Sequence, residues 1–153
     1  MKVDCAASGN VNARIAIVSD YPGQTEVQLK MPQVGAGGRY LWEQLKPYGI
    51  SRNDVWVTNV IKRQVLEADD SKSPVPTGEL QHWHSVLRWE LSQLPNLQII
   101  LCLGAHAARF FIADGRILRW RGSKVLWADK QVFIGVNPAL IIREPKWDIV
   151  FRI

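Results

Sequence analysis

The sequence predicts an α/β fold, a three-layer α/β/α sandwich with a central, mostly parallel four-stranded sheet. Short apolar runs alternate with helical stretches along the chain, and 153 residues suit one hydrophobic core rather than two. Continuous apolar runs are typical of parallel strands that helices cover on both faces. We therefore expect residues 1–153 to form a single domain.

Four apolar segments are expected to form the sheet. They are rich in β-branched and other large apolar residues, and turn or loop residues follow them. The predicted strands are residues 14–18, 55–61, 97–103 and 132–136. A further segment, residues 117–127, indicates a hairpin or two short strands.

Apolar spacing of about one helical turn predicts the helices, and Gly, Pro and polar residues predict the loops. The predicted helices are residues 37–45, 77–94 and 104–111. Thr77 is suited to cap the second of them. Residues 24–36 and 63–76 show no clear period, so we expect long loops there.

Composition excludes several classes of protein. Hydrophobic residues make up 47% and charged residues 22% of the chain, as in globular domains. The apolar run at residues 99–103 is far too short to cross a membrane, and no apolar leader follows Met1. Cys5 and Cys102 do not make a disulfide framework. A cytoplasmic, reducing setting is therefore expected.

The net charge of +5 is unevenly spread. Six basic residues lie between Arg109 and Lys130, together with Trp120 and Trp127. Cations interleaved with aromatic rings suit a phosphate backbone and stacking bases. The same pattern is equally typical of a solvated basic hairpin, so it does not decide between the two interpretations.

Polar residues follow three of the predicted strands. Asp20 comes after the first strand, Asn59 lies near the end of the second, and Asn137 follows the fourth. Ligands of open α/β sheets bind beyond the carboxyl ends of the strands. One carboxylate and two amides suit recognition of a polar ring better than metal binding. Each residue taken singly is also compatible with an ordinary turn or cap.

A series of short motifs follows a fixed order along the chain. The motifs are IVSDYPG at 17–23, PQVGAGG at 32–38, VTNVIK at 57–62, LGAHAA at 103–108, RG at 121–122 and NPA at 137–139. Together they resemble the uracil-DNA glycosylase superfamily, and most closely its family-4, phage DNA-polymerase-related branch. The resemblance extends from about Arg14 to Arg143.

The resemblance implies a monofunctional DNA glycosylase, which flips a uracil or modified pyrimidine out of DNA and hydrolyses its N-glycosidic bond. By resemblance, Asp20 and Asn137 are the catalytic residues, and Tyr21, Gln33 and Asn59 contact the base. The DNA-binding residues implied are Pro22, Gly23, Lys62, Arg121, Pro138 and Arg143. DNA is the expected partner of a monomer, with a replication or repair protein as a further possible partner and no membrane.

The chain departs from the family pattern at three positions. Asn137 replaces the usual histidine, Gln33 replaces the phenylalanine that stacks on the base, and Tyr21 replaces a small residue, which would narrow the pocket. The first two departures favour the alternative, a module that binds DNA or a replication partner with weak or no catalysis. An unrelated nucleotide-binding domain is disfavoured, because the glycines at 35–38 do not follow a strand.

The family-4 branch holds an iron–sulfur cluster on four cysteines. Only Cys5 matches one of those positions, whereas Ser8, Arg63 and Trp83 stand at the other three. We expect no cluster and no other cofactor, with apolar packing around Trp83 in its place. No metal site is expected either, because His82 and His84 diverge on a helix.

Overall fold

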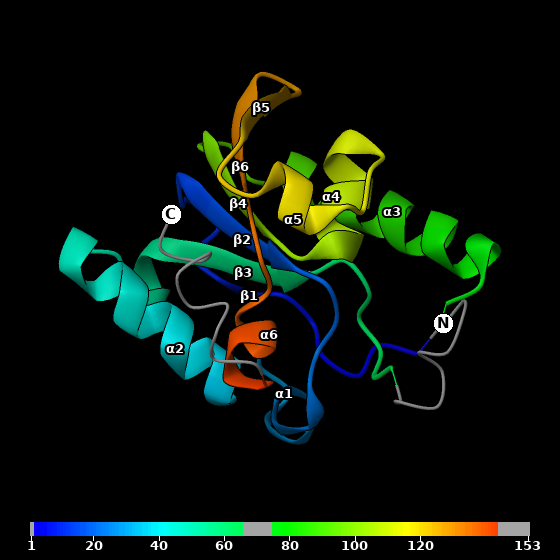
Figure 1. Cartoon of the computed structure of the whole chain (residues 1–153), viewed down its shortest axis with the longest axis horizontal. Coiled ribbons are helices and arrows are strands. Elements are labelled where there is room, and N and C mark those ends of the chain that lie inside the picture. The colour runs from blue at the N-terminus through cyan, green and yellow to red at the C-terminus, as the bar shows by residue number, and fades with distance from the viewer. Residues whose placement is uncertain (1, 66–74, 144–153) are drawn as a thin grey trace.

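The computed structural model describes residues 2–65 and 75–143, and a six-stranded sheet lies at its centre (Figure 1). The strand order is β1-β3-β2-β4-β6-β5. The strands are β1 (Ser8–Gly9), β2 (Ile15–Ser19), β3 (Val55–Asn59), β4 (Ile99–Leu103), β5 (Lys124–Trp127) and β6 (Lys130–Gly135).

Helices and short helical turns lie in the connections between the parallel strands. The α-helices are α1 (Gln24–Leu29), α2 (Ala36–Leu45), α3 (Thr77–Ser92), α4 (Ala105–Ile112), α5 (Ile117–Trp120) and α6 (Pro138–Arg143). Two 3₁₀ turns, η1 (Lys46–Tyr48) and η2 (Arg52–Asp54), lie between α2 and β3. No helix within the described part of the chain is both long enough and apolar enough to span a membrane.

The four predicted strands are present and parallel, in the order β3-β2-β4-β6, but the expectation of a four-stranded sheet was wrong. Two antiparallel strands extend the sheet at its edges: β1 pairs with β3, and β5 pairs with β6. A strand as short as β1 shows no alternation of apolar and polar residues. The β5–β6 hairpin turns at Ala128 and Asp129, which have positive φ angles of 47° and 67°.

Two helix expectations also need correction. The expected loop at 24–36 contains α1, a six-residue helix with no buried residue and hence no apolar stripe that could reveal it. Thr77 is the first residue of α3 rather than its cap, because Pro76 takes the cap position. Of the loop expected at 63–76, residues 66–74 lie outside the described residues.

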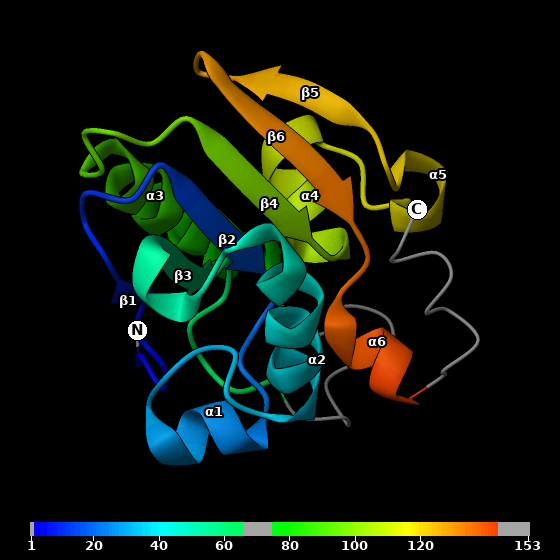
Figure 2. The same cartoon turned by 90° about the vertical axis from the view of Figure 1, so that its left-hand side faces the viewer.

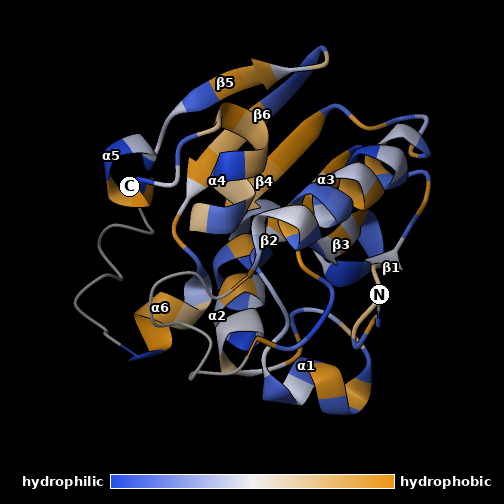
Figure 3. Ribbon diagram, turned by 90° about the vertical axis from the view of Figure 1, so that its right-hand side faces the viewer, coloured by the Kyte–Doolittle hydropathy of each residue, from blue (hydrophilic) through white to orange (hydrophobic). Residues whose placement is uncertain are grey.

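Helices pack on both faces of the sheet and create two apolar cores. Figures 1 and 2 show α2 on one face and α3 with α4 on the other. The α2 side contains Ile17 and Leu41, and the α3 side contains Ile100 and Trp83, all essentially inaccessible to solvent. In Figure 3, β4 is mostly hydrophobic, whereas α3 alternates between hydrophilic and hydrophobic residues. The three-layer arrangement follows from these two cores.

Candidate active site

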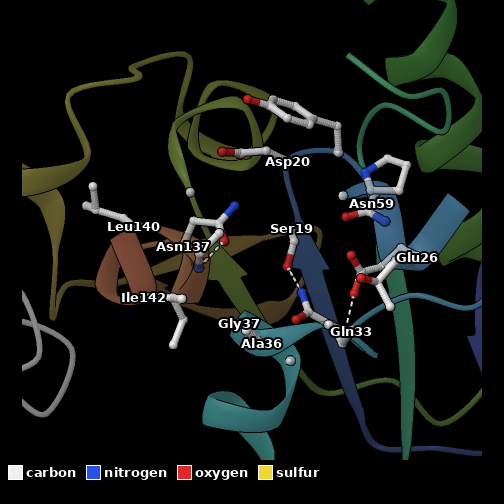
Figure 4. Close-up of a pocket in the computed structure, with 18 of the residues that line it drawn as sticks. Ser19, Asp20, Glu26, Gln33, Ala36, Gly37, Asn59, Asn137, Leu140 and Ile142 are labelled. Carbon is white, nitrogen blue, oxygen red and sulfur yellow. Dashed lines mark hydrogen bonds between the residues drawn. The ribbon is translucent and has the colours of Figure 1, made fainter. Parts of the chain in front are cut away.

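A cavity of about 480 Å³ opens at the carboxyl ends of the parallel strands (Figure 4). Ser19 pairs in register with Asn59 on one side and with Leu103 on the other, so these three strands end at the same level. The polar residues that follow them therefore share one edge of the sheet. The cavity volume lies in the range of small-molecule sites. Asp20, Asn59 and Asn137 all line it.

Asp20 is held at the amino end of α4. It is 9% exposed, and its Oδ1 accepts a hydrogen bond of 3.0 Å from the backbone N–H of Ala107. Burial raises the pKa of Asp20 above its usual value. His106 opposes this pKa increase electrostatically, and hydrogen bonds from Ala107 and Asn137 oppose it further. Hydrogen-bond donors from the amino end of α4 and from Asn137 thus hold the carboxyl group of Asp20 in position.

Gly104, the residue between β4 and α4, permits this arrangement. Its φ angle is +128°, a conformation that side-chain-bearing residues rarely adopt. A Cβ atom built on Gly104 would lie 2.4 Å from both carboxylate oxygens of Asp20. Only glycine allows the carboxylate to lie this close to the backbone.

The segment that follows β3 joins Asn59 to the end of β2. The side chain of Asn59 lines the cavity, and the residue is 4% exposed. The backbone N–H groups of Val60 and Ile61 donate to the carbonyls of Ser19 and Asp20, each at 2.9 Å. The backbones that carry the buried amide and the buried carboxylate are therefore locked together.

Asn137 stands just before α6 and is held by it. Its Oδ1 accepts a hydrogen bond of 3.0 Å from the backbone N–H of Ala139. The amide nitrogen of Asn137 points toward the Asp20 side of the cavity in Figure 4. Since the oxygen is engaged, the amide is oriented to donate into the cavity.

Gln33 projects into the cavity from a strained loop. Its φ angle is +57°, and its Nε2 donates to the Oγ of Ser19 at 2.6 Å. The carbonyl of Gln33 accepts from Trp42 Nε1 at 3.0 Å and from Arg52 Nη2 at 2.7 Å. The Arg52 guanidinium stacks 4.9 Å from the centre of the Trp42 ring. These contacts hold both the backbone and the side chain of Gln33 in place.

Glu26 and Arg52 are site-forming residues that the sequence reasoning missed. Oε2 of Glu26 accepts from the backbone N–H groups of Val34 at 2.8 Å and Gly35 at 2.5 Å. Glu26 also lines the cavity. Both residues bind backbone atoms of the loop between α1 and α2, and a contact with backbone requires no particular residue type there, so neither side chain leaves a motif in the sequence that could have signalled its role.

Of the other residues predicted for the site, some line the cavity, one is exposed outside it, and two are buried. Tyr21, Pro22, Gly23 and Arg143 line the cavity with the residues described above. Arg121 is exposed but does not line the cavity, and its guanidinium donates to the Leu118 carbonyl.

The expectation that Lys62 and Pro138 bind DNA needs correction, because the structure buries both residues. Lys62 is 4% exposed and forms an ion pair with Glu90 at 3.1 Å. Pro138 is buried at the start of α6. A DNA strand outside the protein does not reach either side chain in this conformation.

The residues at the four positions where the resemblance implies cluster ligands do not suit an iron–sulfur cluster, because the cluster needs thiolates. Cys5 supplies one buried thiol, whereas Arg63 and Trp83 both donate to Oε2 of Glu79, at 2.6 and 2.9 Å. Trp83 is 1% exposed and belongs to the core. Within residues 2–65 and 75–143, no group of three His, Cys, Asp or Glu side chains is placed to hold a metal ion.

Comparisons with known proteins show which family and which relatives the chain is similar to. The family model described as "Uracil DNA glycosylase superfamily" matches residues 6–150. A type-4 uracil-DNA glycosylase of Thermotoga maritima is 32% identical over 139 residues, which cover 88% of this chain and 69% of that protein. A type-4 uracil-DNA glycosylase of Archaeoglobus fulgidus is 37% identical over 149 residues, which cover 90% of this chain and 71% of that protein.

Proposed function

The chain belongs to the uracil-DNA glycosylase superfamily, and we propose that it is a monofunctional DNA glycosylase. It hydrolyses the N-glycosidic bond of a flipped uracil or modified pyrimidine in DNA. The observation that carries this proposal is the convergence of Asp20, Asn59 and Asn137 on one cavity at the carboxyl end of the sheet. Type-4 relatives at 32% and 37% identity support the same reaction.

Asp20 is assigned to the sugar side of the scissile bond. Cleavage of this bond develops positive charge on the sugar, which a nearby carboxylate stabilises while it orients the attacking water. The hydrogen bond from Ala107 holds the carboxylate in place before the substrate arrives. Such preorganisation avoids the cost of rearrangement during the reaction.

Asn59 and Asn137 are assigned to the base. The leaving base gains negative charge, and amide donors beside its carbonyl groups stabilise that charge. Asn59 reads the polar edge of the base, because a carboxamide presents both donors and an acceptor. Asn137 donates from the α6 side of the cavity, in place of the histidine of the family pattern, and remains neutral at every pH.

Gln33 is assigned to the flat face of the base, and Tyr21 is assigned to the edge of the base pocket. The Gln33 amide lies flat against a base less favourably than an aromatic ring, which buries more apolar area. Pro22, Gly23 and Arg143 surround the mouth of the cavity and are assigned to the DNA backbone. Arg121, which is exposed at the end of α5 and does not line the cavity, is also assigned to the DNA backbone.

Within the superfamily, we place the chain in the type-4 branch with its phage DNA-polymerase-related members, and we propose that it works without an iron–sulfur cluster. The ion pair of Arg63 with Glu79 and the burial of Trp83 support this, since these residues stand where thiolates would be needed. Purified protein should be colourless and contain no iron. Stoichiometric iron with visible absorbance would contradict the proposal.

Base excision is the direct test of the function. Single- and double-stranded oligonucleotides that carry uracil or modified pyrimidines are incubated with the protein, and abasic sites are then cleaved with alkali. We expect uracil-dependent product, which Asp20→Ala and Asn59→Ala abolish while the circular dichroism spectrum stays unchanged. DNA binding without abasic sites on every base tested would instead support the module that binds DNA without catalysis.

A further inference from the structure

Lys62 has no access to DNA, yet its ammonium group lies directly behind the base-reading segment. We propose that Lys62, paired with Glu90, is a positioning residue that fixes the end of β3 and thereby sets both Asn59 and Asp20. This inference rests on the proposed function, because the segment it fixes carries the residues assigned to the base and the sugar.

The ammonium group of Lys62 uses all three of its donors inside the protein. Nζ lies 2.7 Å from Oγ1 of Thr58, 2.8 Å from the carbonyl oxygen of Asn59 and 3.1 Å from Oε2 of Glu90. Only 5% of the Lys62 side chain is exposed. The cation is therefore committed to the backbone and side chain at the end of β3, and it cannot bind a phosphate as well.

Glu90 connects this cation to the helix layer. Its Oε1 accepts from Trp56 Nε1 at 3.3 Å, while its Oε2 faces Lys62. Trp56 lies in β3 and Glu90 lies in α3, so the pair joins the strand to the helix that packs behind it. Only 11% of the Glu90 side chain is exposed, which makes water a poor substitute for either partner.

The same segment holds Asp20. Between Asn59 and Lys62, the N–H groups of Val60 and Ile61 donate to the Ser19 and Asp20 carbonyls. A shift of this segment would move the backbone of both site residues together. Small displacements of positioned groups reduce catalytic rates strongly, because the reacting geometry tolerates little error.

A buried ion pair is a costly way to gain stability alone. Replacing both partners of such a pair by neutral groups is often neutral for stability, whereas removing one partner strands a buried charge. Replacing the pair as a whole therefore separates a structural role from a positioning role. The chain also contains a matched control, the pair Arg63–Glu79, which joins the same two parts of the fold and whose glutamate also accepts from a tryptophan.

The test compares the double variants Lys62→Met/Glu90→Gln and Arg63→Met/Glu79→Gln. We expect the first to lower kcat for uracil excision about tenfold or more with KM within about threefold of wild type. The control should leave both constants within about threefold of wild type. Lys62→Arg, which keeps a cation and donors, should recover part of the lost kcat. Thermal unfolding verifies that each variant is folded.

Amide hydrogen exchange supplies a readout that does not need activity. The N–H groups of Val60 and Ile61 should exchange faster in Lys62→Met/Glu90→Gln and remain protected in the control. If that double variant does not fold, Thr58→Val removes one of the three acceptors of Lys62 without changing side-chain shape. It should then show the same two effects more weakly.

The outcomes are distinguishable. An active wild-type protein whose kcat and exchange rates are unchanged in Lys62→Met/Glu90→Gln, or in Thr58→Val if that is the folded variant, overturns the positioning role. A wild-type protein that is inactive on every base overturns the proposed function instead. In that case the exchange rates alone still decide whether Lys62 fixes the segment.

Discussion

Both carboxylate oxygens of Asp20 lie 2.4 Å from the point where a Cβ atom of Gly104 would be. The glycine between β4 and α4 therefore determines where the buried carboxylate can lie. This relationship links a backbone conformation at the amino end of α4 to the chemistry of the cavity.

Gly104→Ala should lower excision activity by about a hundredfold, because the new methyl group pushes the carboxylate away from its place. Single-turnover kinetics on a uracil oligonucleotide measure this effect. Gly49→Ala is the matched control: Gly49 also has a positive φ angle, +72°, but no atom lies within 4 Å of its added Cβ. It should cost stability without loss of activity. Equal activities of the two variants would contradict the proposed constraint.

Glu26→Ala should destabilise the loop at the floor of the cavity. The partly buried N–H groups of Val34 and Gly35 lose their acceptor. A fully buried donor without a partner costs about 1–3 kcal/mol, so we expect a smaller loss here, because water can replace part of the interaction. We expect a lower Tm and faster amide exchange at both residues. Glu26→Gln keeps one acceptor oxygen and should fall between the alanine variant and wild type. Unchanged exchange at residues 34 and 35 in Glu26→Ala would show that the loop does not depend on this carboxylate.

The sequence predicts the four parallel strands because each is an apolar run whose burial can be read locally. It also predicts which polar residues meet, since the carboxyl ends of parallel strands share one edge. It does not predict α1, which buries no residue, or β1, which has only two residues. Short elements of this kind depend on tertiary pairing rather than on their own residue pattern.

The misassignment of Lys62 has a similar cause. Lys62 is the last residue of the VTNVIK motif, and the family resemblance implied that its side chain contacts DNA. Its true partner, Glu90, lies one helix later, and no local spacing connects the two residues. The contacts of Glu26 and Arg52 with the backbone of residues 33–35 leave no residue pattern either, because backbone groups are the same at every position. Sequence patterns thus indicate the strand ends better than they indicate the side chains that hold those ends.

Gln33→Phe tests the departure from the family's stacking position. A ring in this place should stack on the flipped base, and base–aromatic stacking contributes about 1–3 kcal/mol. We expect kcat/KM for uracil to rise by about five- to tenfold, although the hydrogen bond to Ser19 is lost. Gln33→Leu, which is apolar without a ring, is the control and should not reproduce the gain. A phenylalanine variant no better than the leucine variant would argue against base stacking at this position.

Arg143→Ala tests the basic mouth of the cavity. Loss of one phosphate contact should weaken DNA binding and reduce the slope of log affinity against log salt by about one. Fluorescence anisotropy at several salt concentrations measures the slope. Lys46→Ala, an exposed cation just beyond the far end of α2, is the control and should leave it unchanged. An unchanged slope in Arg143→Ala would exclude a phosphate contact by this residue.

Asp20→Asn should separate activity from stability. Loss of the carboxylate should lower the excision rate by about a hundredfold or more, since it can no longer stabilise the sugar cation or orient water. Burial raises the pKa of Asp20, so the folded protein binds this proton more tightly than the unfolded chain does. The ionised carboxylate therefore opposes folding above its folded pKa, and the penalty disappears as the pH falls below the pKa of the unfolded chain.

Asp20→Asn keeps an oxygen that can accept from Ala107, and it removes the charge. Its Tm should exceed that of wild type near pH 7, and the difference should shrink as the pH approaches about 4. Glu43→Gln, which neutralises an exposed carboxylate on α2 that does not line the cavity, is the control for nonspecific effects of charge. A Tm difference that does not shrink as the pH falls from 7 toward about 4, or that turns further in favour of wild type as the pH rises, would contradict a raised pKa of Asp20.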